Sequence, residues 1–236
     1  EIYTLSLHDA LPILVDRKTN TDDSDTARTT GADHDAPERS GPWDAGDLPA
    51  AAASRSRLDL GSLQVPAVNG MQVRLETDKA NGVAGSVVLV LAGSSLELRA
   101  FAAPRTFGIW DELRSDILDE LSRGRARTQE ITGDHGIEIL AQIPVRAAGG
   151  QAGVVDVRFI GVDGPRWFLR GVLQGRAATD EKAAAALREV FNDVVVVRDS
   201  QARPPREILP LHAPGQSAGP EVEDLPGVNQ DRKSVV

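Results

Sequence analysis

Alternation of apolar and polar residues along short stretches predicts that this chain is built mostly from β-strands. Met71, Val73 and Leu75 alternate with polar side chains, which is typical of a strand with one face toward a core. Residues 86–92 form a continuous apolar run, typical of a central strand covered on both faces. The same reasoning predicts strands over residues 63–67, joined to 71–77 by a turn, and over 96–102, 129–132, 137–145, 154–162, 166–174 and 194–197.

Two stretches have the period of an amphipathic helix instead. Residues 109–121 carry Ile and Leu at a spacing of three to four, with acidic residues in the first turn. A second helix is predicted over residues 180–191, with Thr179 as its N-cap. Most connections between predicted strands are short enough for hairpins. We therefore expect an α+β fold, in which an antiparallel sheet of hairpins has two flanking helices.

The clearest hairpin is predicted around the dipeptide Asp163-Gly164, which separates two apolar runs. A two-residue turn at this dipeptide places Ile160 opposite Trp167 and Phe159 opposite Phe168. These two pairs lie on opposite faces of the hairpin, so both faces need cover from water. One helix covers one face, and the other face requires a second helix, a tail or a partner.

The two ends of the chain are expected not to belong to the protein. Residues 1–13 resemble a translated sequencing adapter, and the reverse complement of one codon choice for residues 8–13 translates as residues 231–236. Residues 14–57 are acidic and residues 199–230 are rich in Pro, so we expect two disordered tails. Residues 58–198 hold nearly all the large aliphatic side chains and form the expected single domain.

The distribution of charge argues against nucleic-acid binding. The net charge is −9, but residues 58–198 contain eighteen acidic and sixteen basic residues, so the expected domain is nearly neutral. Nucleic-acid binding requires a basic surface. The chain has no Cys, which excludes disulfides and thiolate metal sites. Because no apolar run is long enough for a membrane helix, we expect a cytoplasmic protein. We also expect no metal and no cofactor.

The candidate ligand-binding residues are Arg166, Arg170 and Trp167. Guanidinium groups suit carboxylate or phosphate groups, and the alternative is that these arginines form salt bridges within the sheet. Trp167 either lines a ligand pocket, together with the other aromatic residues Phe101, Trp110 and Phe168, or belongs to the core. We assign no catalytic residue.

Two other patterns carry no function in this interpretation. The G-x-S-x-G string at residues 215–219 lies between two Pro residues in a tail, without the strand and helix that a serine hydrolase requires. His34, His135 and His212 do not have the spacing of a zinc site.

Six strings carry a resemblance to a known family. They are G-P-W-D at 41–44, R-L-D-L-G-S-L at 57–63, L-R-A-F-A-A-P-R at 98–105, I-W-D-E-L-R at 109–114, R-F-I-G-V-D-G-P-R-W-F-L-R-G-V at 158–172 and V-F-N-D-V-V-V-V-R at 190–198. In these strings the chain resembles the actinobacterial family called domain of unknown function 3710, from residue 41 to about 211. The resemblance implies no established activity. The order of elements is also similar to the PsbP/Mog1-like fold, an antiparallel sheet flanked by helices.

Two functional hypotheses follow from the sequence. The preferred one is a non-enzymatic protein-binding or scaffolding module that self-associates through the uncovered face of the predicted hairpin. The alternative is a domain that binds a small molecule or an anion such as a nucleotide or phosphate, conceivably a nucleotide-linked enzyme, through Arg166, Arg170 and Trp167.

Overall fold

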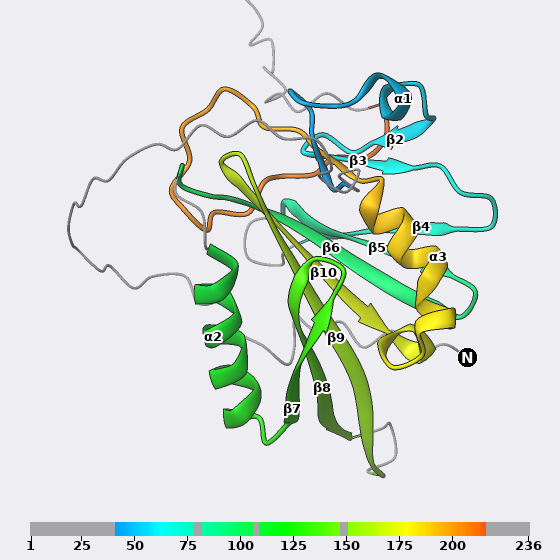
Figure 1. The fold of residues 1–236 in the computed structure, drawn as a ribbon, viewed down its shortest axis with the longest axis vertical. Helices are drawn as coiled ribbons and strands as arrows, with labels where there is room; N and C mark the ends of the chain where they lie inside the picture. Colours follow the sequence, from blue (N-terminus) through cyan, green and yellow to red (C-terminus); the bar gives the residue numbers. More distant parts are fainter. Residues whose placement is uncertain (1–40, 78–81, 106–108, 147–150, 216–236) are drawn as a thin grey trace, which may run out of the picture.

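The main body of the protein is a seven-stranded sheet with a helix on each face (Figure 1). The computed structural model describes residues 41–77, 82–105, 109–146 and 151–215. Across the large sheet the strands are β4 (Gln72–Thr77), β5 (Ala84–Leu91), β6 (Ser94–Ala102), β10 (Trp167–Gln174), β9 (Ala152–Gly164), β8 (Gly136–Arg146) and β7 (Arg127–Gly133). Every neighbouring pair in this sheet is antiparallel, so the expected α+β class is confirmed.

A second, four-stranded sheet lies across one end of the molecule. Its strands, in order, are β1 (Trp43–Asp44), β11 (Val195–Val196), β3 (Leu63–Pro66) and β2 (Arg57–Asp59). The helices are α1 (Ala50–Ala53), α2 (Ile109–Arg123) and α3 (Glu181–Asn192), and a 3-10 turn, η2 (Gly175–Ala178), precedes α3. The expected hairpin between residues 63–67 and 71–77 is wrong. Because β3 already pairs with β2 and β11 on its two edges, β4 instead joins the large sheet.

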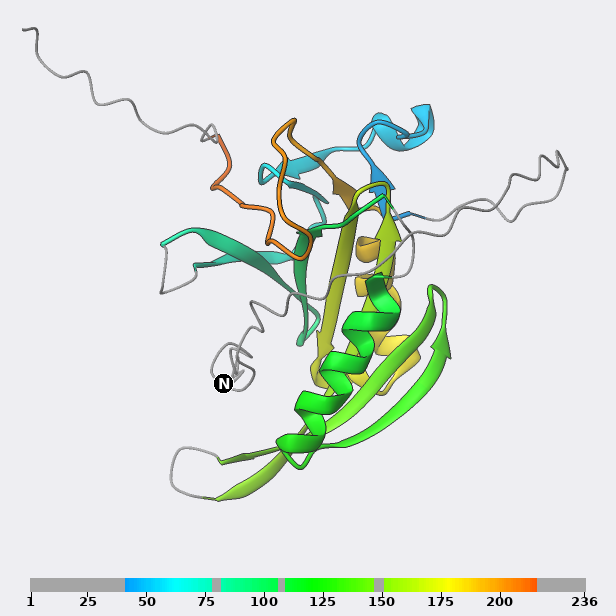
Figure 2. The same ribbon diagram turned by 90° about the vertical axis from the view of Figure 1, so that its left-hand side faces the viewer.

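Both faces of the large sheet are covered from within the chain. On one face, α3 and the small sheet enclose a core that includes Ile160, Trp167 and Phe191. On the other face, α2 packs over a cluster that includes Trp110 and Phe168, and Figure 2 shows α2 in front of the sheet. Of the three covers that the sequence left open for the second face of the hairpin β9–β10, the structure shows a second helix, since α3 and α2 each cover one face. The hypothesis of self-association through an uncovered face of this hairpin is therefore wrong.

Two glycines in the central strands let these helices approach. A Cβ on Gly161 would lie 2.2 Å from the ring of Trp110, and one on Gly171 would lie 2.8 Å from the ring of Phe191. Each ring therefore rests directly on a strand backbone. This close packing explains how one aromatic residue from each helix fills the space above the hairpin.

The register of the hairpin β9–β10 differs from the expected one. Trp167 lies opposite Gly164, and Ile160 lies opposite Gly171, so the turn is Pro165-Arg166 rather than Asp163-Gly164. Proline suits the first central position of a turn because its φ is fixed there. Gly164 is needed in the ladder, since a Cβ on it would lie 2.1 Å from the Trp167 ring. Despite this difference in register, side chains still alternate between the two faces of the hairpin, and both faces carry large apolar groups as expected.

The fold extends beyond residues 58–198 at both ends. The Trp43 backbone N–H donates to the Val194 carbonyl at 2.8 Å, and β1 pairs in parallel with β11. At the other end, Leu209 and Leu211 are buried. Residues 41–57 and 199–215 therefore belong to the packed domain, while residues 1–40 and 216–236, with both adapter-like ends, lie outside the described residues.

Helix α3 begins at an acidic cap. The Asp180 carboxylate accepts hydrogen bonds from the backbone N–H groups of Lys182 and Ala183, so Asp180 is the N-cap rather than Thr179. Both hydrogen bonds lower the pKa of Asp180, and the one from Ala183 has the larger effect. The helix itself starts one residue later than expected and ends at Asn192.

Candidate functional site

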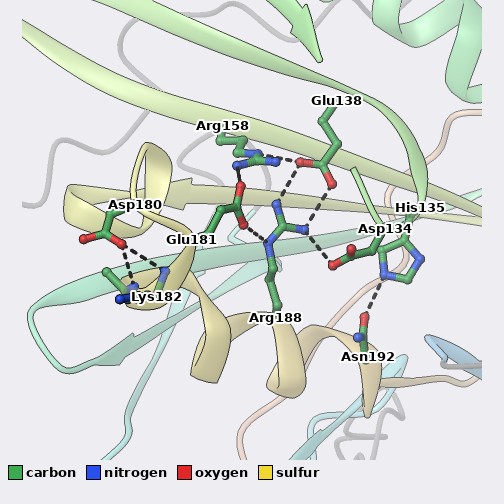
Figure 3. A network of polar contacts seen from close by, with 10 residues as sticks. Asp134, His135, Glu138, Arg158, Asp180, Glu181, Lys182, Arg188 and Asn192 are labelled. Atoms are coloured by element: carbon green, nitrogen blue, oxygen red, sulfur yellow. Dashed lines mark hydrogen bonds and ion pairs between the residues drawn. The ribbon is translucent and has the colours of Figure 1, made fainter. Parts of the chain in front are cut away.

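A network of charged side chains joins α3 to strands β8 and β9 (Figure 3). At its centre is Glu138, whose side chain is 1% exposed. The Arg188 guanidinium donates to both of its carboxylate oxygens, at 3.1 and 3.0 Å. The Arg158 Nε donates to Oε2 at 2.5 Å. One carboxylate thus holds two buried guanidinium groups, and a Cβ on Gly133 would collide with it at 1.9 Å.

The outer side of this network is closed by exposed acids. Glu181, at the start of α3, accepts from Arg158 at 2.5 Å and lies 3.4 Å from Arg188. The hydrogen bond from Arg158 lowers the pKa of Glu181 despite partial burial. Burial has the largest single effect on the pKa of Arg188 and lowers it, but the hydrogen bond and charge of Glu138, together with the charges of Glu181 and Asp134, outweigh burial and raise that pKa. Since each guanidinium has acidic partners, the network fixes α3 on the sheet and does not form a ligand site by itself.

The turn between β7 and β8 adds the last contacts of the network. Asp134 lies 3.4 Å from Arg188. The His135 Nε2 is hydrogen-bonded to the Asn192 side chain at 2.7 Å, and the ring stands edge-on to Phe191. His135 is therefore part of the contact between this turn and the end of α3. Nothing in the spacing of the sequence indicated these contacts, because the partners are 50 to 57 positions apart.

The other buried acids are also paired with arginine. Among the described residues, the buried acids are Glu97, Glu138 and Asp193. Glu97 lies 3.5 Å from Arg99 and 3.2 Å from Arg170. Asp193 binds Arg57 at 2.6 Å. These carboxylates act as fixed counter-charges for guanidinium groups, which is a structural role.

Asp163 is an acid with a different environment. Its Oδ2 accepts a hydrogen bond of 3.3 Å from the Trp110 backbone N–H, at the start of α2. Burial raises the pKa of Asp163, the hydrogen bond from Trp110 opposes the rise, and the nearby Asp111 adds to it. This contact anchors the first turn of α2 on the end of β9.

The structure does not bring the three sequence-predicted site residues together. Trp167 lies in the core under the small sheet, where its Nε1 donates to Asp44 at 2.6 Å. Arg170 lies on the opposite face, paired with Glu97 and placed over the Phe101 ring at 5.9 Å. Trp167 and Arg170 are an odd number of positions apart, so strand alternation separates them. The salt-bridge alternative for Arg170 describes the observed pairing.

Arg166 lies in the turn at the tip of the hairpin β9–β10, directly before Trp167. Its backbone is in contact with Arg198, which was not among the residues expected at the site. The Arg198 Nη1 donates to the Arg166 carbonyl at 3.0 Å. The Arg198 guanidinium is thus bound to the backbone of the hairpin turn. No sequence signal places Arg198 there, because it follows β11, 32 positions away.

The aromatic residues belong to the core rather than to a ligand pocket. The rings of Trp110 and Phe168 stack at 5.6 Å between centroids, and those of Phe101 and Phe168 lie 5.9 Å apart. The Trp110 Nε1 donates to the Ile137 carbonyl at 2.8 Å. Burial of the ring with its N–H satisfied is the usual state of a core tryptophan.

Neither a metal-binding group nor a membrane-spanning helix is found among the described residues. In residues 41–215, leaving out the three internal gaps, no group of three or more His, Asp or Glu is placed to hold a metal ion. Over the same part of the chain, no helix combines the length and the apolar character that a membrane span requires. Of the G-x-S-x-G string, all but Gly215 lies outside the described residues.

Comparison with known proteins places the chain in a family. No curated protein matches it at a significant level. Among solved structures it is similar to the solution structure of cyanobacterial PsbP (CyanoP) from Synechocystis sp. PCC 6803, with 13% identity and a TM-score of 0.35, over 61% of this chain and 93% of that chain. We draw no functional conclusion from that similarity. A family model matches residues 41–219, and the chain belongs to the family it describes, "Protein of unknown function (DUF3710)".

Proposed function

We propose that this chain is a non-catalytic protein-binding module that self-associates through the far end of the hairpin β8–β9. The far end is defined as Ile143–Arg146 of β8 and Ala152–Asp156 of β9. Figures 1 and 2 show this part of the hairpin extending past the neighbouring strands. The observation that carries the proposal is that its backbone edges have no paired strand among the described residues.

The pairing of the sheet stops before the far end on both sides. Strand β7 begins opposite Gln142, so the outer edge of β8 from Ile143 onward is open. Strand β10 ends opposite Val157, so the outer edge of β9 from Ala152 to Asp156 is also open. A two-stranded hairpin alone is marginally stable in water, and open edges are templates for pairing with another strand.

The side chains of the far end favour contact with protein. Val154 is 63% exposed, the largest exposure among the large apolar side chains that the structure describes as exposed. Pro144, opposite Val154, is exposed as well. Of the nine residues in the two segments, only Arg146 and Asp156 are charged. Burial of these apolar groups against a partner would add hydrophobic stabilisation to the backbone hydrogen bonds.

A second copy of the chain fits the edge of β9. Proline has no N–H, so in a sheet its nitrogen faces an unpaired edge. The Pro144 nitrogen therefore faces the outer edge of β8. Because it carries no N–H, this edge is a poor template for pairing with another strand. Its partner Val154 then directs its own N–H and carbonyl to the open edge of β9. One receptive edge per chain favours a closed twofold dimer over an open fibre.

The charges are compatible with that dimer. In antiparallel pairing of β9 with its copy about Val154, Ala152 lies across from Asp156, and Gly153 lies across from Val155. No two like charges face each other, which removes the repulsion that would oppose pairing. The pairing of the buried acids with arginine, described above, supports a binding role rather than a catalytic one.

Sedimentation velocity of the full chain tests this proposal. The wild-type chain is expected to sediment as a dimer at micromolar concentration, and Val154→Lys as a monomer, because two Lys would meet at the twofold axis. Val154→Pro is expected to act in the same way, since it removes the N–H at the open edge and spares the ladder with β8. Val68→Lys changes a residue that is 38% exposed and lies in the connection after β3, so it serves as the matched control. A wild-type monomer, or a dimer that survives Val154→Pro, would refute the proposed interface.

A further inference from the structure

The two charged residues of the far end, Arg146 and Asp156, lie on the same face of the hairpin β8–β9. Asp156 is two positions before Arg158 along β9, and Arg146 is an even number of positions after Glu138 along β8. Arg158 and Glu138 both hydrogen-bond to side chains of α3, so both lie on the α3 side of the sheet. Since side chains at even spacing share a face of a strand, Asp156 and Arg146 lie on that side as well.

Within one chain these two charges are too far apart for an ion pair. Asp156 lies opposite Gln142 and Arg146 lies opposite Ala152, so the two positions are four residues apart along the hairpin. At about 3.3 Å per residue, this is a separation of roughly 13 Å. The Asp156 Oδ1 accepts a hydrogen bond from the Gln142 amide at 3.0 Å. That bond fixes the carboxylate and leaves its second oxygen for another donor.

Pairing of β9 with its copy brings the two charges closer. This step rests on the proposed function, in which Val154 lies opposite itself and Asp156 lies opposite Ala152 of the partner. The partner's Arg146 is next in the same row, because it is paired with Ala152 in its own chain. Two strand spacings of about 4.8 Å put the Cα atoms of Asp156 and the partner's Arg146 roughly 9.5 Å apart. The small side chain of Ala152 between them lets the long stem of Arg146 lie across it.

Only one register of the two β9 strands gives this arrangement. A strand must shift by two positions to keep its side chains on the same face. A shift in one direction puts Asp156 opposite Val154, in line with Pro144 of the partner. A shift in the other direction puts Ala152 opposite Val154, in line with the partner's Val154 rather than with Asp156. Either shift separates Asp156 from the partner's Arg146.

We propose that two ion pairs, each between Asp156 of one copy and Arg146 of the other, fix the register of the dimer and make its formation depend on ionic strength. Val154 and Pro144 of both copies form an apolar stripe at the centre, and one ion pair lies on each side of it. An apolar centre with a polar rim is the usual arrangement of a protein–protein interface. A second copy fits this surface because its two charges complement each other about a twofold axis.

Reversal of each charge provides matched variants. Arg146→Asp and Asp156→Arg each replace the two ion pairs by two pairs of like charges, so each variant alone should dimerise about tenfold more weakly. In an equimolar mixture the two variants complement each other, because every charge at these positions then faces an opposite charge. The control is Arg166→Asp, which makes the same change in charge at an exposed turn position beyond the opposite end of β9. The φ of 64° at this position is one that Asp tolerates.

The experiment is sedimentation velocity of the full chain over a range of concentrations, at low and at high sodium chloride. At low salt we expect equal dimer affinity for wild type and Arg166→Asp, weaker dimers for each reversed variant alone, and recovery of the wild-type affinity in their mixture. High salt should weaken the wild-type dimer, since exposed ion pairs are screened. A wild-type dimer with reversed variants of equal affinity, or a mixture as weak as its components, would overturn the ion pairs and leave the β9 interface standing. A wild-type monomer would overturn the interface itself.

Discussion

A chain that ends at Arg198 is expected to lose most of its folding free energy. Beyond Arg198, the segment from Glu207 to Leu211 lies between the diverging ends of β5 and β6. The Leu209 N–H donates to the Ala100 carbonyl at 2.9 Å, and the Leu211 N–H to the Ala84 carbonyl at 2.8 Å. His212 then bonds to Leu60, next to the small sheet. This segment therefore closes the large sheet and ties it to the small one.

The expected loss follows from the burial of this segment. Removing the side chain of a buried Leu costs about 2–5 kcal/mol, and Leu209 and Leu211 are both buried. Two such losses approach the whole stability of a domain, about 5–15 kcal/mol. The measurement is urea unfolding followed by circular dichroism, with a chain that ends at Gly215 as the control. Equal urea midpoints for the chains ending at Arg198 and Gly215 would contradict this account.

The single substitution Leu209→Ala is expected to lower the free energy of unfolding by about 2–5 kcal/mol by itself.

Glu138→Gln is expected to destabilise the fold by about 3–5 kcal/mol, because it leaves two buried guanidinium groups without their shared carboxylate. Their side chains are only 6% and 9% exposed for Arg158 and Arg188, so water cannot replace the lost charge. Urea unfolding at pH 7 measures the loss. The control is Glu181→Gln, which removes a partner that is 66% exposed and should cost less than about 1 kcal/mol. Equal losses for the two variants would show that Glu138 is not the centre of the network.

Acid should weaken the contribution of Glu181 specifically. Arg158 lowers the pKa of Glu181 in the folded state, so this contribution is complete above the unfolded pKa and is lost as pH falls through the lowered, folded pKa. The difference between wild type and Glu181→Gln should therefore shrink in acid. A triple variant, Glu138→Leu with Arg158→Met and Arg188→Leu, should recover most of the stability, since no buried charge of this network remains.

The periodic elements could be predicted from the sequence because each one carries its own signal. Helix α2 was expected over residues 109–121 and is observed over Ile109–Arg123. The alternation along β9 and β10 correctly indicated two apolar faces. The register was missed because it depends on Pro165 in the turn and on the space that Gly164 leaves for the Trp167 ring, neither of which is a periodic signal.

The segments outside residues 58–198 were missed for a different reason. Trp43 is an isolated apolar residue among polar residues, Leu209 and Leu211 lie in a short apolar run broken by Pro210, and such short stretches cannot fold alone. They are stable only against a sheet that the rest of the chain provides. The charged sites depend in the same way on contacts between distant residues, such as Glu138 with Arg188 and Arg166 with Arg198, so spacing along the chain did not indicate them.

Self-association through the edge of β9 is tested most directly by a single cysteine at its centre. The chain has no Cys, so Val154→Cys introduces a unique thiol. Directly paired residues of antiparallel strands have Cα atoms about 4.5–5.5 Å apart, which suits a disulfide. We predict rapid, reversible disulfide dimer formation under mild oxidation for Val154→Cys and little for Val68→Cys. Equal, slow cross-linking of both variants would contradict pairing of β9 with its copy.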